Sequence, residues 1–152
     1  MRWNGFARSL LFAALAAAAF PLFALVADPV LGRVSALSLY LVGIAAVYAA
    51  GLAPRRSRAA LAAGIASALG VGVLLLAPSV GTVAAGAALI VGVCRSGILY
   101  RSRRARALVM ETCLLAGGLA LARFLAGPDT AQMAFAIWGF FLVQSFFFLV
   151  GG

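Results

Sequence analysis

Long apolar stretches alternate with short polar breaks along almost the whole chain. Apolar runs of about 20 residues recur from Phe6 to the C-terminus, and as helices they are long enough to cross the ~30 Å hydrocarbon core of a bilayer. The pattern therefore predicts an all-α, polytopic membrane protein with six transmembrane helices. The predicted helices cover residues 6–27, 35–52, 59–77, 80–100, 105–125 and 131–150.

The breaks between these helices are rich in turn formers and in arginine. They are Asp28-Pro29 with Gly32-Arg33, Pro54-Arg55-Arg56-Ser57-Arg58, Pro78-Ser79, Arg101-Ser102-Arg103-Arg104 and Gly127-Pro128-Asp129. Such short connections predict one transmembrane domain, 1–152, built as three helical hairpins. Evenly spaced prolines at the hairpin tips support a repeat hypothesis with copies at 1–54, 55–102 and 103–152, although evenly spaced helices alone would give the same pattern.

The distribution of arginine predicts the orientation of the chain. In a six-helix arrangement, only Arg33 and Arg123 fall on or near one side of the membrane. The other side holds Arg2, Arg8, Arg55, Arg56, Arg58, Arg101, Arg103, Arg104 and Arg106. The positive-inside rule then predicts that both termini are cytoplasmic, in a multi-pass protein of the bacterial inner membrane. The arginines of the two basic turns are also expected to contact anionic lipid headgroups.

Composition narrows the function classes. Mean hydropathy is +1.16 and 66% of the residues are hydrophobic, which leaves no room for a soluble domain. The formal charge of +9 does not indicate nucleic-acid binding, because no basic segment stands outside the predicted transmembrane helices and their short connecting turns. The chain has no histidine and only three acidic residues, so we expect neither a metal site nor a catalytic triad, and no cofactor. An enzyme is not expected.

Two charged residues lie inside predicted helices at matching depth. Arg95 precedes Arg101 by six residues and Glu111 follows Arg106 by five, which places both roughly 7–9 Å inside the cytoplasmic boundary. They form a candidate intramembrane polar pair. One interpretation is a cytoplasm-facing site for a proton, an anion or a headgroup. The alternative is a structural charge pair, or an arginine whose side chain extends to the headgroups.

The last predicted helix is rich in phenylalanine and carries Gln144 in its centre. One interpretation is a helix that docks on another membrane subunit or a second copy, with a candidate partner interface at Trp138, Phe141, Gln144 and Phe148. The alternative is a lipid-facing helix with Gln144 bonded within the monomer. The leading functional hypothesis is a non-catalytic scaffold, assembly or accessory subunit of a membrane complex. The alternative is a small carrier or channel subunit that uses Arg95 and Glu111.

Stripes of small residues predict where helices approach closely. Gly64, Ala68 and Gly72 repeat every four residues in the third predicted helix, and the fourth carries a similar stripe. The connection between these helices is only Pro78-Ser79, so we expect them to pack tightly. Cys94 and Cys113 are expected to pack as reduced, small apolar side chains.

The predicted topology can be tested by cysteine labelling from outside intact cells. Ser79→Cys and Thr130→Cys should be labelled, because both positions lie in turns on the arginine-poor side. Ser57→Cys and Ser102→Cys should be protected, because they lie in the two basic turns. Labelling of the Ser102 position from outside would contradict the topology.

The predicted Arg95–Glu111 pair can be tested by a double-mutant cycle. Arg95→Ala and Glu111→Ala should each lower thermal stability, because each leaves a charge in the membrane without its opposite. The double variant should lose clearly less than the sum of the single losses. Strictly additive losses would refute the pairing.

Overall fold

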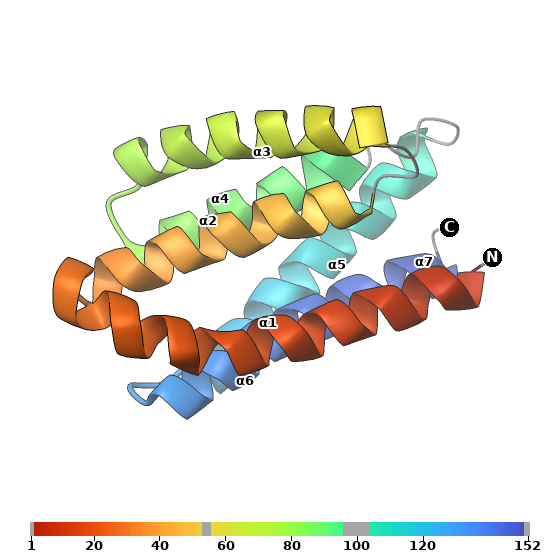
Figure 1. Cartoon of the computed structure of the whole chain (residues 1–152). Coiled ribbons are helices and arrows are strands. Elements are labelled where there is room, and N and C mark those ends of the chain that lie inside the picture. The colour runs from red at the N-terminus through yellow and green to blue at the C-terminus, as the bar shows by residue number, and fades with distance from the viewer. Residues whose placement is uncertain (1, 53–55, 96–103, 151–152) are drawn as a thin grey trace. The chain divides into compact units, whose positions relative to one another are not determined.

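The computed structural model describes residues 2–52, 56–95 and 104–150, and their regular structure is helical throughout (Figure 1). The helices are α1 (Arg2–Leu31), α2 (Arg33–Gly51), α3 (Arg56–Leu76), α4 (Val80–Gly92), α5 (Arg104–Leu125), α6 (Thr130–Ser145) and α7 (Phe147–Val150). This confirms the all-α class.

Four of the described helical segments are long and apolar enough to cross a membrane. These segments are Gly5–Leu31, Arg33–Gly51, Ser57–Leu76 and Thr130–Leu149, and Val80–Arg95 is a shorter apolar helix. The chain therefore has the character of a membrane protein. Each predicted helix overlaps a helix of the structure over most of its described residues, but α5 is not among the four. The six-span hairpin arrangement and the orientation of the termini stay predictions.

The first turn differs from the sequence prediction. Instead of ending before Asp28-Pro29, α1 continues through both residues to Leu31, and Gly32 alone separates it from α2. Gly32 has φ 76° and ψ 149°, a backbone conformation that glycine adopts without steric strain. Its N–H donates to the carbonyl of Asp28 at 3.0 Å and closes the end of α1. A single glycine therefore makes the turn for which the sequence predicted two breaks.

The turn at Pro78-Ser79 is as short as predicted, and Ser79 caps α4. The backbone N–H of Thr82 donates to Ser79 Oγ at 3.3 Å, and the N–H of Ser79 donates to Thr82 Oγ1 at 3.1 Å. This reciprocal pair is a capping box, which satisfies N–H groups that lack a partner within the helix. It allows α4 to start directly after the turn.

The last predicted helix is divided in two near its end. Ser145 Oγ donates to the carbonyl of Leu142 at 2.6 Å, and the N–H of Phe146 donates to the carbonyl of Val143 at 3.1 Å. Both bonds span three residues and tighten the last turn of α6. The chain then resumes as the short helix α7.

The chain divides into two compact units, residues 27–104 and residues 1–26 with 105–152. We call the first the central unit and the second the terminal unit. In the central unit, α2 contacts both α3 and α4, and α3 contacts α4 (Figure 1). A Cβ atom on Gly86 of α4 would lie 2.6 Å from Val73 Cγ1 of α3, so this glycine permits the close approach of the two helices. The predicted tight packing of these helices is confirmed.

The terminal unit is organised around α6. The rings of Phe12 in α1 and Phe141 in α6 pack edge-to-face with centroids 5.1 Å apart. On α5, Leu121 and Leu125 pack against Gly139 of α6, where an added Cβ would lie 2.8 Å from Leu125 Cδ1. Helix α6 therefore contacts α1 through aromatic rings and α5 through a glycine.

Candidate functional site

Arg95 lies at the end of α4, within a short π-helical turn over residues 93–95. Its exposed fraction is 0%, and so is that of Cys94 beside it. Cys94 Sγ donates to the carbonyl of Ala62 in α3 at 3.9 Å, so this turn is held against α3. Arg95 is therefore a buried charge at a distorted point of an apolar helix.

Glu111 lies in the first half of α5 and is 4% exposed. Both members of the candidate polar pair are thus buried. Arg95 belongs to the central unit and Glu111 to the terminal unit, so their pairing stays a prediction.

Gln144 joins two helices of the terminal unit. Its exposed fraction is 0%, and Nε2 donates to the carbonyl of Leu114 in α5 at 3.0 Å. Gly118, one turn further along α5, allows this approach, because a Cβ there would lie 3.1 Å from Gln144 Nε2 and 3.0 Å from the ring of Phe140. In the structure, the hydrogen bond of Gln144 lies within the monomer, as in the second of the two interpretations of this residue.

The residues predicted as a partner interface are largely inside the terminal unit. Phe141 is 3% exposed and Phe148 is 7% exposed. Phe148 packs over Gly5 of α1, where a Cβ would lie 2.7 Å from the Phe148 ring. With Gln144 also buried, the predicted surface is corrected: only Trp138, at 36%, is exposed. The physical reason is that Phe141, Gln144 and Phe148 lie on the side of α6 and α7 that packs against α1 and α5.

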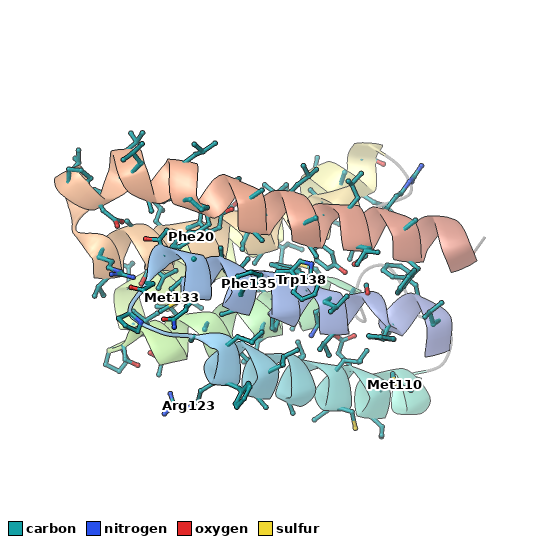
Figure 2. The ribbon with its side chains drawn as sticks, turned by 90° about the horizontal axis from the view of Figure 1, so that it is seen from below. Phe20, Met110, Arg123, Met133, Phe135 and Trp138 are labelled. Atoms are coloured by element: carbon teal, nitrogen blue, oxygen red, sulfur yellow. The ribbon has the colours of Figure 1, made fainter. Side chains whose placement is uncertain are left out.

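A different set of aromatic residues faces outward on the last helices. Phe135 is 60% exposed, Trp138 36% and Phe146 44%, and Figure 2 shows Phe135 and Trp138 on α6. At about 100° per residue Phe135 and Trp138 lie about 60° apart around α6, and Phe146 follows in the turn after this helix. We call them the aromatic stripe. The sequence does not distinguish this stripe, because aromatic residues occur all around the helix and composition does not separate its buried side from its exposed side.

The arginines of the basic turns are placed only in part. Arg56 lies in the first turn of α3 and Arg104 and Arg106 in the first turn of α5, while Arg58 is exposed. Arg55, Arg101 and Arg103 lie outside the described residues. At the other end of α5, Arg123 is exposed and, like Met110, lies on the side turned away from α6 (Figure 2).

The two cysteines have different environments. Both are free thiols, but Cys94 is buried and Cys113 is exposed on α5. The expectation of a packed thiol is met for Cys94 only. Among the described residues, no group of His, Cys, Asp or Glu side chains is placed to hold a metal ion.

No protein-family model, curated protein or solved structure matches this chain.

The bond from Gln144 predicts a measurable contribution to stability. Gln144→Leu should lower the free energy of unfolding in detergent by about 0.6 kcal/mol, and at most about 1.7 kcal/mol, the range for hydrogen bonds between membrane helices. Phe124→Leu on α5 is the control, and it should leave stability nearly unchanged because the side chain is 84% exposed. Equal stability of Gln144→Leu and the unmodified protein in chemical unfolding would contradict this role.

Proposed function

We propose that this chain is a non-catalytic integral membrane protein that acts as a scaffold, assembly or accessory subunit of a larger membrane complex. The observation that carries the proposal is the aromatic stripe of Phe135, Trp138 and Phe146, whose side chains are 36–60% exposed. The partner that this stripe would meet is another membrane subunit or a second copy of the chain.

An aromatic stripe is suited to contact with protein more than with lipid. Lipid tails are as apolar as leucine, so helices associate in membranes through van der Waals contact rather than through the hydrophobic effect. Aromatic rings offer large contact areas, and pairs of them contribute about 0.5–1.5 kcal/mol beyond the burial of area. The large apolar side chains exposed on α1 are instead aliphatic, including Leu11, Leu15 and Leu22 at 60–70% exposure. This contrast within one unit favours α6 as the partner-facing helix.

The polar side chains at the end of α6 support the same proposal. Gln144 donates to Leu114 and Ser145 donates to Leu142, so both side chains hold the fold of the terminal unit. Recognition at α6 would then rest on the shape of the aromatic stripe. The absence of histidine and the scarcity of acidic residues in the sequence support a non-catalytic role. Cytoplasmic termini in a bacterial inner membrane remain part of the proposal, on the strength of the arginine distribution.

The proposal can be tested by removing the aromatic shape while keeping the surface apolar. The full chain is extracted from membranes in a mild detergent, and the mass of the assembly is measured by light scattering. We expect a mass above the 15.5 kDa of one chain. The triple variant Phe135→Leu, Trp138→Leu, Phe146→Leu should weaken the assembly by about tenfold or more, since each lost aromatic contact contributes about 0.5–1.5 kcal/mol.

The matched control is Phe124→Leu, which removes an aromatic ring that is 84% exposed on α5, outside the stripe. Its assembly should have the mass of the unmodified protein. A photoreactive residue at position 138 should in addition crosslink to a protein. A single chain in the unmodified sample, or an intact assembly in the triple variant, would refute the proposed partner face.

A second candidate function, a small carrier or channel subunit, is favoured by one specific observation. Arg95 is fully buried at a π-helical turn, in a helix that is otherwise apolar. Ionisable residues inside membrane helices frequently mark ion or substrate paths. Solute or ion flux in proteoliposomes that Arg95→Gln abolishes, together with an unchanged assembly in the triple aromatic variant, would establish this candidate over the first.

A further inference from the structure

Arginine residues gather at one end of the central unit. Cys94 Sγ lies 3.9 Å from the carbonyl oxygen of Ala62, and Cys94 also packs in a cluster with Ala49, Ala66 and Ile90. The last turns of α2 and α4 and the first turns of α3 therefore lie together. This end carries Arg56 and Arg58 at the start of α3 and Arg95 at the end of α4.

The terminal unit has the same asymmetry. The rings of Phe6 and Phe146 lie 6.2 Å apart, so α1 begins where α6 ends. The start of α5 is at this end too, because α5 and α6 run in opposite directions, as the contacts of Leu114 with Gln144 and of Leu121 with Gly139 require. The arginines at this end are Arg2, Arg8 and Arg106, and Arg104 at the start of α5 is the last residue of the central unit.

The opposite end of each unit carries balanced charges. In the central unit, Asp28 lies near the end of α1 and Arg33 at the start of α2, so one negative and one positive charge occur at this turn. In the terminal unit, Arg123 near the end of α5 accompanies Asp129 at the start of α6. Every other arginine of the chain belongs to the arginine-rich ends or to the connections at 53–55 and 96–103, with Glu111 as the one acid among them. The formal charge of +9 is therefore carried by the arginine-rich ends and their connections.

We propose that the arginine-rich ends bind anionic phospholipid headgroups selectively over zwitterionic ones. Each end lies where apolar helices terminate, which is the depth of the phosphate groups of a bilayer. All the basic residues are arginine, whose planar guanidinium group can donate two parallel hydrogen bonds to a phosphate. Attraction of one basic side chain to an anionic bilayer surface corresponds to about fivefold in affinity. This inference does not depend on the aromatic stripe or on any partner subunit.

The apolar surface beside the exposed arginines favours a phospholipid over a soluble polyanion as the ligand. Arg8 is exposed in the second turn of α1 and Arg58 in the first turn of α3, and both lie next to apolar, exposed helical surface such as Leu11 and Leu61. A phospholipid satisfies both surfaces, because its phosphate meets the guanidinium while its tails cover the leucines. A nucleic acid would meet only the arginines.

Two variants with the same net charge test the proposal. Arg8→Gln with Arg58→Gln removes exposed arginines from the arginine-rich ends. Arg33→Gln with Arg123→Gln removes exposed arginines from the opposite ends and is the matched control. Binding of phosphatidylglycerol and of phosphatidylcholine to the full chain in detergent micelles is measured by native mass spectrometry, with thermal unfolding as a check on folding. Inorganic phosphate and a short single-stranded oligonucleotide serve as competitors.

We expect the unmodified protein to bind phosphatidylglycerol more tightly than phosphatidylcholine. Arg8→Gln with Arg58→Gln should weaken phosphatidylglycerol binding by at least about tenfold, since each arginine contributes about fivefold, and the control should weaken it less than about threefold. Equal binding of the two lipids by the unmodified protein would overturn the proposal even if a variant fails to fold. Equal losses in the two variants, or complete displacement of lipid by inorganic phosphate or by the oligonucleotide, would also overturn it.

Discussion

The fold depends on helices that approach one another closely enough to make contact without help from water. Lipid tails solvate an apolar helix as well as another helix does, so association must come from van der Waals contact and a few hydrogen bonds. Glycine supplies the necessary proximity on both units. In the central unit, Gly86 leaves room for the side chain of Val73. In the terminal unit, Gly118 leaves room for Phe140 and Gly139 leaves room for Leu125. A side chain at any of these three glycine positions would push apart the helices that now pack there.

The same solvent explains why the few polar side chains lie where they do. A polar group exposed to hydrocarbon has no water to bond with, so it is retained only where the protein supplies a partner. Gln144 reaches the carbonyl of Leu114 across the interface of α5 and α6, and Ser145 bonds to its own helix. Arg95 is fully buried, and it lies beside the contact of Cys94 with Ala62. Polarity inside this chain therefore fixes helix positions, and it leaves the outward surface of α6 to aromatic side chains.

Hydropathy and turn residues each report one property of a segment, and this limits how much of the helix arrangement the sequence predicts. Hydropathy reports whether a segment is apolar, so it locates the helices well, and turn residues predict the breaks at Pro78-Ser79 and Gly127-Pro128-Asp129. Neither hydropathy nor the turn residues report which side of a helix is buried in the protein. The stripe of Gly64 and Gly72 predicted the α3–α4 contact, yet a Cβ on either glycine would meet nothing within 4 Å. The contact runs through Gly86 and Val73 instead. For the same reason Phe141 and Phe148 were assigned to a partner surface, although they pack inside the terminal unit.

The two exposed surfaces of the terminal unit impose different requirements on its surroundings. The aromatic stripe runs along the side of α6 and would meet a neighbour within the plane of the membrane, whereas the arginine-rich end would meet headgroups at its surface. Phe146, the last residue of the stripe, packs against Phe6 between Arg2 and Arg8 of α1. A partner that covers the whole stripe must therefore reach the level of the arginines, where anionic lipid is also expected to bind. Such a partner has to be neutral or acidic at that depth, because a basic one would be repelled by the arginines and would compete with them for lipid.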